Sequence, residues 1–238
     1  MRDFATRPGD HRFFSIMSIL AAAVVVTGFS QTYPAMALRG GPGIPAIVHV
    51  HAAIFTCWLA LFVAQTTLIG RGRVDLHRRI GVVGMVLATL MLIVGAATAI
   101  AVARLGHRGI PGVEFPDAAG FLLLNLESIV VFFALVLAGW YFRRSSPTHK
   151  RLMLMATVGG LMPPGIARLP LVSGHTPVIG ATVMAFLLAG PAYDLVTRKR
   201  LHAAYGWSLL VAILAIPPLV GQVSATETWH RIASWLLQ

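Results

Sequence analysis

The chain has 238 residues, of which 57% are hydrophobic and only 11% are charged, and its mean hydropathy is +0.78. Soluble domains carry about 25% charged residues, so this composition excludes an ordinary soluble protein. The net charge of +11 does not indicate binding of nucleic acid, because the basic residues lie in short segments between apolar runs. The single cysteine, Cys57, excludes an internal disulfide and a cluster of thiolate ligands.

Apolar segments recur along the whole chain. A helix needs about 20 apolar residues to cross about 30 Å of hydrocarbon. We therefore expect an all-α polytopic membrane bundle, one domain over residues 1–238 with seven transmembrane helices. The expected spans cover residues 13–33, 45–69, 78–103, 118–142, 150–170, 177–196 and 202–222.

The first apolar segment has an alternative interpretation. Basic residues, an apolar run and the small-residue sequence "PAMA" ending at Ala37 are also typical of a cleaved signal peptide. Retention as a span and removal as a signal peptide both leave the second span starting outside the cytoplasm. The remaining topology is the same in either case.

Basic residues are distributed unequally between the two sets of loops, which predicts a cytoplasmic N-terminus and an external C-terminus. Fourteen lie in or beside the segments expected inside, namely Arg2, Arg7, Arg12, Arg71, Arg73, Arg78, Arg79, Arg143, Arg144, Lys150, Arg151, Arg198, Lys199 and Arg200. Five lie on the other side, namely Arg39, Arg104, Arg108, Arg168 and Arg231.

A histidine beside basic residues precedes or opens three of the apolar runs. The phrases are "VDLHRRIGVVG" with His77, "THKRLMLMATVGG" with His149 and "RKRLHAAYGWSLL" with His202. Hairpins over 45–103, 118–170 and 177–222 therefore look like three copies of one unit, with the third copy the most diverged.

His77, His149, His202 and Asp194 form a candidate metal site at the inner side. Neutral imidazole binds zinc, copper, iron and haem iron. We expect His77 and His149 to be the leading pair for haem or a transition metal. The alternative is that these histidines lie at headgroup level in the lipid bilayer, where the neighbouring cations contact anionic lipid headgroups.

A second candidate site lies toward the outer side. Glu127 is well inside the fourth span, and ionisable residues within a membrane are functional candidates. Arg168 is its expected partner, either in a pocket of a transporter or channel or in a buried pair that fixes helix packing. His51 and His175 lie on the same side and are an alternative cofactor-binding pair.

Two further segments predict local features. The stretch "GGLMPPGIARLP" should kink or break the fifth span, because consecutive prolines remove backbone donors and clash with the preceding turn. Residues 227–237 place Trp229, Ile232 and Trp235 in a short amphipathic pattern, which predicts a helix on the outer membrane surface.

The phrases at His77, His149 and His202, with "HVHAAIFTCWLALFVAQTTLIG" before the first, resemble a family of bacterial multipass inner-membrane proteins over residues 47–207. The phrase at His149 is also similar, more distantly, to small membrane proteins linked to haem–copper oxidase assembly. There, a histidine followed by two basic residues opens a span. The resemblance implies a bacterial inner membrane and a haem or copper role for His149, Lys150 and Arg151, and through the repeat for His77, Arg78 and Arg79.

Three functions are open at this point. The first is binding of haem or a transition metal for redox or cofactor-assembly work. The second is proton-coupled transport through Glu127 and Arg168, and the third is a structural or partner-binding role in the membrane. The sequence has no His-Glu-x-x-His, Cys-x-x-Cys or phosphate-binding glycine motif, so no catalytic residue is assigned.

Overall fold

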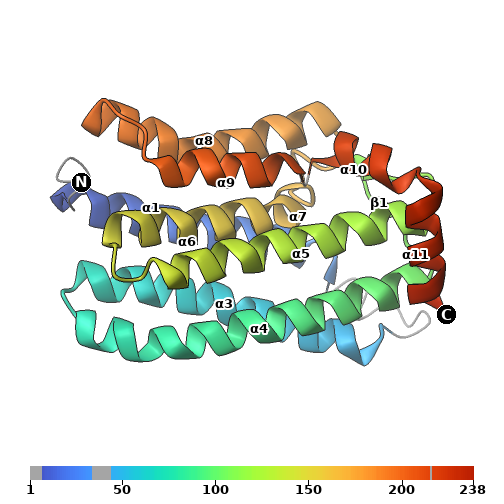
Figure 1. Cartoon of the computed structure of the whole chain (residues 1–238), viewed down its shortest axis with the longest axis horizontal. Helices are drawn as coiled ribbons and strands as arrows, with labels where there is room; N and C mark the ends of the chain where they lie inside the picture. The colour runs from blue at the N-terminus through green and yellow to red at the C-terminus, as the bar shows by residue number, and fades with distance from the viewer. Residues whose placement is uncertain (1–6, 34–43, 215) are drawn as a thin grey trace.

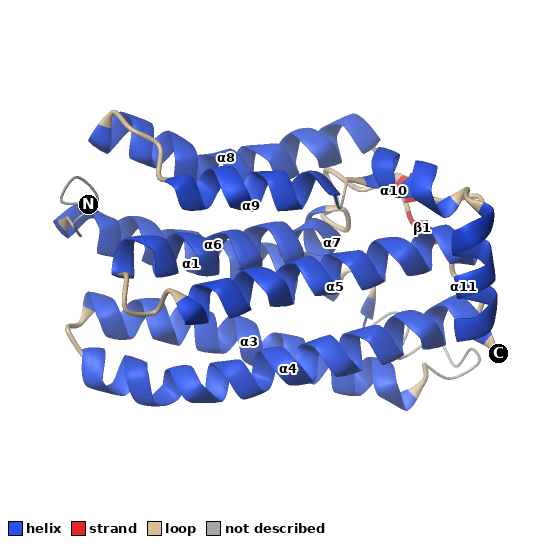
Figure 2. Cartoon of the chain, viewed as in Figure 1, coloured by secondary structure: helices blue, strands red, loops and turns tan. Residues whose placement is uncertain are grey.

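The computed structural model describes residues 7–33, 44–214 and 216–238. Over these residues the chain forms ten α-helices and one small antiparallel hairpin (Figure 1; Figure 2), which confirms the all-α class. The helices are α1 (Pro8–Ser30), α3 (Ala46–Gly70), α4 (Val74–Arg104), α5 (Ala118–Tyr141), α6 (Ser146–Gly160), α7 (Met162–Ile166), α8 (Thr176–Arg198), α9 (Ala203–Leu214), α10 (Pro217–Ser224) and α11 (Glu227–Leu237). The hairpin between α4 and α5 consists of β1 (Gly109–Ile110) and β2 (Val113–Glu114).

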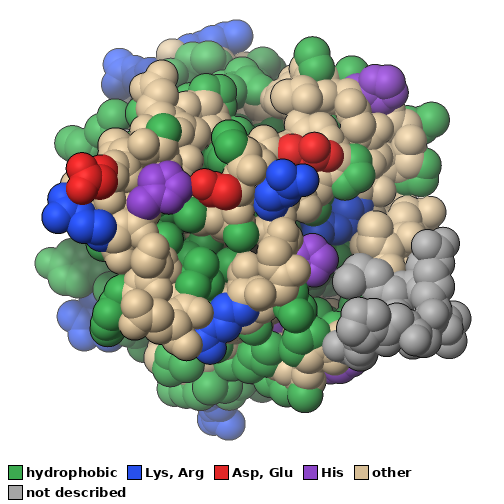
Figure 3. Space-filling model, turned by 90° about the vertical axis from the view of Figure 1, so that its right-hand side faces the viewer, with side chains coloured by type: hydrophobic (Ala, Val, Ile, Leu, Met, Phe, Trp, Pro, Cys, Tyr) green, Lys and Arg blue, Asp and Glu red, His purple; other side chains and the backbone are tan. Residues whose placement is uncertain are grey.

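The long helices run along one axis, so the bundle has two ends (Figure 1). We call one the basic end; it holds the start of α1 and the turns α3–α4, α5–α6 and α8–α9, at residues 71–73, 142–145 and 199–202. The opposite end holds the β-hairpin and α11, and there acidic, basic and histidine side chains are scattered among apolar ones (Figure 3). Successive connections between the long helices therefore lie at opposite ends of the bundle, as the sequence predicts.

Five of the described helices are long and apolar enough to cross a membrane: α1 from Gly9, then α3, α4, α5 and α8. Helices α9 and α10, which are bent by 42° at a short break, could together provide a sixth span. The expected span 150–170 is not among these candidates, because it is divided into α6 and the five-residue α7. The seven-span count and the three-hairpin repeat stay predictions.

Helix α6 differs from the other long helices because it is surrounded by protein. It contacts α1, α5, α8 and α9, and Leu154, Met155, Ala156 and Val158 are each at most 2% exposed. A helix whose neighbours are other helices presents little surface to lipid. It can therefore be shorter and more polar than a lipid-facing span.

The predicted break in this segment is present. Helix α6 ends at Gly160, and α7 begins at Met162 with Pro163 and Pro164 in its first turn. Prolines are tolerated in a first turn because the backbone N–H groups there have no partner within the helix. The two prolines thus start a new helix instead of continuing α6.

Helix α1 is packed into the bundle. A Cβ atom on Gly28 would lie 2.1 Å from the carbonyl oxygen of Gly165, and one on Gly165 would lie 2.8 Å from Cα of Val25. The backbones of α1 and α7 therefore touch, as small residues allow in membrane proteins. The hydroxyl groups of Ser18 and Thr66 also join α1 to α3 at 2.8 Å. Helix α1 is therefore a packed part of the described bundle, and its retention as a span stays a prediction.

The outward side of α4 carries large apolar side chains. Val82, Val86, Leu90 and Ile93 recur every three or four residues and are 41–60% exposed. An exposed apolar stripe of this length is unusual on a soluble monomer, and lipid would cover it. It supports the character of an integral membrane protein.

Helix α11 lies across the opposite end and packs on α4 and α5 (Figure 1). The indole Nε1 of Trp229 donates to the carbonyl oxygen of Ala119 at 2.9 Å, and Ala233 is 2% exposed. Trp235 and Ile232 point away from this contact and are 72% and 46% exposed. The predicted helix is confirmed, and its contact with a membrane surface stays a prediction.

Candidate functional site

The structure brings His77 and His149 together at the basic end. Each is the fourth residue of its helix, and each backbone N–H donates to the carbonyl of the residue before that helix, Arg73 at 3.0 Å and Ser145 at 2.9 Å. The imidazole rings are nearly perpendicular, at 82°, and their centroids are 6.1 Å apart. The two similar sequence phrases thus place their histidines at equivalent positions that face each other.

The imidazole of His149 is oriented by α5. Its Nδ1 lies 2.8 Å from the carbonyl oxygen of Gly139, and because a carbonyl only accepts, Nδ1 carries the hydrogen. The close approach of α5 and α6 makes this possible, since a Cβ on Gly139 would lie 2.8 Å from Sδ of Met153. In the neutral ring, Nε2 then carries the free lone pair. This is the usual arrangement of a metal-binding histidine, whose other nitrogen donates to a carbonyl or carboxylate.

The imidazole of His77 is less satisfied. Its Nδ1 is buried and has no hydrogen-bond partner among the described residues, and the same holds for Oε1 of Gln65 on α3. The main chain of Gln65 lies within hydrogen-bonding reach of the His77 ring, so the lack of a partner concerns Nδ1 alone. A buried polar atom without a partner costs about 1–3 kcal/mol. Sequence reasoning missed Gln65, because a single amide near the end of an apolar run carries no motif.

Asp194, predicted as a metal ligand, is held by arginines instead. Arg151 donates from Nε at 2.8 Å and from a terminal nitrogen at 2.6 Å, one bond to each carboxylate oxygen, and Arg198 adds a third at 3.3 Å. The Asp194 and Arg151 side chains are 1% and 0% exposed. Both oxygens are engaged by guanidinium groups, so Asp194 does not join the histidine pair.

A second buried carboxylate, Asp10, extends this arrangement to α1. A terminal nitrogen of Arg198 donates to both Asp10 oxygens at 2.7 Å, the Tyr193 hydroxyl donates at 3.0 Å, and Lys150 forms an ion pair with the same carboxylate. We call Asp10, Lys150, Arg151, Asp194 and Arg198 the ion network. It connects α1, α6 and α8. The role of Asp10 has no sequence signal beyond a single acidic residue before an apolar run.

His202 belongs near the ion network and not to the histidine pair. It immediately precedes α9, and its Nδ1 accepts the backbone N–H of Ala204 at 3.1 Å. Burial lowers the pKa of His202, and the positive charge of Arg151 lowers it further. Among the described residues, no three His, Cys, Asp or Glu side chains lie together as a metal-binding group. The predicted four-residue set of His77, His149, His202 and Asp194 is therefore not assembled.

The predicted pairing of Glu127 with Arg168 is not formed, and no ion pair joins these two described residues. Arg168 donates to the carbonyl oxygen of Pro164 at 2.8 Å, and its guanidinium lies 4.5 Å from the ring centroid of Phe29. The turn that follows α7 folds this side chain back over its own backbone and against α1. The half-buried Glu127 stays on α5. The alternative of a buried pair that fixes helix packing is therefore not supported among the described residues, and transport through Glu127 and Arg168 stays a prediction.

The outer histidines also remain apart. His51 stacks on Phe55 with ring centroids 3.8 Å apart, and its Nδ1 is buried without a hydrogen-bond partner among the described residues. His175 is exposed in the connection before α8. No hydrogen bond or ring contact joins these two described histidines.

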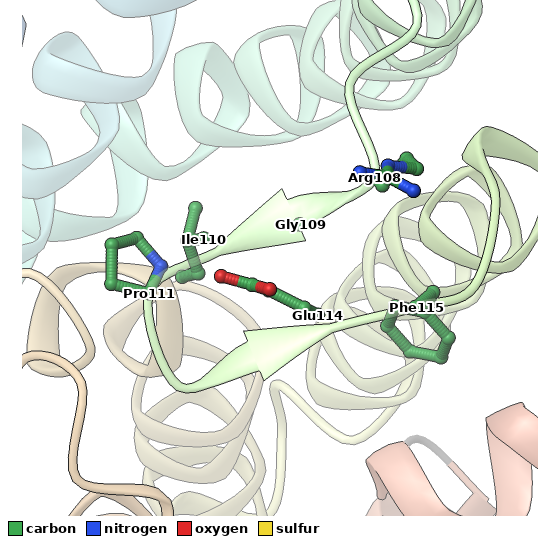
Figure 4. A pocket seen from close by; sticks show the side chains of 6 residues that line it. All are labelled: Arg108, Gly109, Ile110, Pro111, Glu114 and Phe115. Atoms are coloured by element: carbon green, nitrogen blue, oxygen red, sulfur yellow. The ribbon is translucent and has the colours of Figure 1, made fainter.

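A cleft of about 290 Å³ lies at the opposite end, around the β-hairpin (Figure 4). None of the predicted site residues lines it. Its lining consists of Arg108, Gly109, Ile110, Pro111, Glu114 and Phe115.

No protein-family model matches this chain, and neither does any curated protein or solved structure with which it was compared. The fold and the apolar helices define a helical bundle with the character of an integral membrane protein. Any more specific function must be inferred from the side chains at the basic end.

Proposed function

We propose that the chain is an integral protein of the bacterial inner membrane that binds a transition-metal ion at its basic end, through His77 and His149, for redox or cofactor-assembly work. The observation that carries the proposal is the contact between these two imidazoles. They come from different hairpins, and one of them is oriented by a carbonyl.

The separation of the rings suits one shared ion. Two Zn–N bonds of about 2.0–2.1 Å, plus roughly 1 Å from each nitrogen to its ring centre, place two centroids about 6 Å apart when the bonds are collinear and about 5 Å apart at a tetrahedral angle. The centroids of His77 and His149 are 6.1 Å apart. Small rotations of the side chains would then direct a lone pair from each ring at the same point.

Haem is the second candidate, because an iron with two axial imidazoles requires a similar separation of the rings. A porphyrin, however, also needs a planar slot between the two imidazoles. A single ion needs no such slot, and we therefore favour it. The visible spectrum separates the two cases.

The proposed topology places the basic end in the cytoplasm and the C-terminus outside. Helix α6 with α7, and α9 with α10, would serve as broken spans and complete a set of seven. Support comes from the exposed cations at the basic end, which the positive-inside rule places in the cytoplasm and which anionic lipid headgroups would contact. These are Arg71, Arg73, Arg78, Arg79, Arg143, Arg144, Lys199 and Arg200.

The test is metal analysis and visible absorption of the full chain purified in mild detergent, oxidised and reduced. We expect one transition-metal ion per chain, lost in His77→Ala and in His149→Ala and kept in the control His107→Ala, whose side chain is exposed at the opposite end. A Soret band that shifts on reduction would identify haem instead. Protein without metal or haem, or metal retained in both single variants, would contradict the proposal.

A further inference from the structure

Two imidazoles alone do not complete a metal site. Structural zinc sites have four protein ligands, and catalytic ones usually have three with a water. If His77 and His149 hold an ion as proposed above, further donors must lie beside them. The side chains around His77 indicate where one of them is.

Gln65 lies on the correct face of the neighbouring helix. Its Nε2 is 3.8 Å from the position of a Cβ on Gly81, and Gly81 is one turn after His77 on α4. Residues four apart share a helix face, so the amide of Gln65 lies along the face of α4 that carries His77. The Gln65 main chain also lies beside the imidazole.

The two helices therefore present two buried polar atoms without partners. His77 contributes Nδ1 and Gln65 contributes Oε1, and neither has a hydrogen-bond partner among the described residues. One cation between α3 and α4 would satisfy both atoms. Nε2 of His149 would be a further ligand of the same cation.

We propose that Gln65 supplies the third protein ligand, through Oε1, to the metal ion held by His77 and His149; this inference rests on the proposed function. Two imidazole nitrogens and one amide oxygen form a neutral donor set. Such a set suits a borderline divalent transition metal such as Zn²⁺, Co²⁺ or Cu²⁺. Ca²⁺ and Mg²⁺ prefer oxygen ligands alone, and Cu⁺ prefers sulfur.

The experiment measures Zn²⁺ affinity by titration of the full chain in detergent, with Co²⁺ absorption as the probe of ligand number. Gln65→Leu should weaken binding by about 10–100-fold or more, since even residues that only support a ligand have effects of that size. Gln65→Glu should tighten binding, because a carboxylate adds a charge to the same oxygen. Gln222→Leu, at an exposed position on α10, is the matched control and should bind like the parent.

The failures of the two proposals are distinguishable. If the parent binds no Zn²⁺ or Co²⁺, both are overturned. If His77→Ala abolishes binding while Gln65→Leu and Gln65→Glu bind like the parent, only the role of Gln65 is overturned. The amide would then be turned to donate from Nε2 to Nδ1 of His77. Tighter binding in Gln65→Glu supports the proposal even where Gln65→Leu fails to fold.

Discussion

The histidine pair and the ion network meet at the same turn of α6, yet they differ in how far their buried polar atoms are hydrogen-bonded. Lys150 and Arg151 point into the ion network, where both carboxylates accept several charged donors. His149 points the other way, toward His77, whose Nδ1 has no partner among the described residues.

In the ion network, as far as the structure describes the chain, only Nε of Arg198 is buried without a partner, while every carboxylate oxygen accepts a charged donor. Buried ions paired in this way are typical of a structural role. At the histidine pair, the described residues leave the buried Nδ1 of His77 and Oε1 of Gln65 free for the ion that we propose.

The largest effect should come from breaking the ion network. Asp194→Leu leaves the buried guanidinium of Arg151 without its carboxylate, which should reduce the free energy of unfolding by about 3–5 kcal/mol. The double variant Arg151→Met with Asp194→Leu should recover most of that loss, because no charge is stranded. Unfolding in detergent measures both. Equal stability of the parent and the single variant would contradict a structural role.

The second-largest effect should be stabilisation by Zn²⁺, which should depend on the histidine pair and not on the ion network. A free concentration about 100 times the Kd should stabilise the parent by about 2.7 kcal/mol, because the ion binds the folded state. The increase should vanish in His77→Leu and persist in the Arg151→Met, Asp194→Leu double variant. Thermal unfolding with and without Zn²⁺ is the measurement. An equal increase in His77→Leu would place the ion elsewhere.

The smallest effect should come from the rim of the ion network. The Lys150 side chain is 16% exposed, and Asp10 keeps its two bonds from Arg198 when the lysine is removed. Lys150→Met should therefore reduce the free energy of unfolding by about 1–2 kcal/mol, less than Asp194→Leu, because the Asp10 carboxylate stays paired with Arg198. A loss as large as that of Asp194→Leu would show that Lys150, and not Arg198, carries the contact with α1.

Hydropathy predicts the lipid-facing helices well because lipid imposes a length and an apolar surface on them. Helices α3, α4 and α5 therefore begin and end within a few residues of expectation at most of their boundaries. The same logic fails for α6, which packs against protein and carries Arg151 in its buried face. The span 150–170 was predicted from composition alone, whereas the structure of this segment depends on tertiary contacts.

The histidine pair was predictable because two similar phrases place His77 and His149 at the same position of two helices. Gln65 was not, because a single amide carries no motif, and Asp10 was not, because its partner Arg198 is 188 positions away. The pairing of Glu127 with Arg168 failed for a related reason. Membrane depth can be estimated along a straight helix, but the turn after α7 sets the direction of Arg168 independently of its depth.

The bond between Asp10 and Arg198 spans 188 positions of the chain. During synthesis, Asp10 is made among the first residues, and its guanidinium partner follows only when α8 is nearly complete. Lys150, on α6, is made before Arg198 and is the first cation that can pair with Asp10. Before α6 is made, neither cation is present. The first helix can pack on α3 as soon as α3 is made, through Ser18 and Thr66, whereas its carboxylate gains its last cation only with the end of α8.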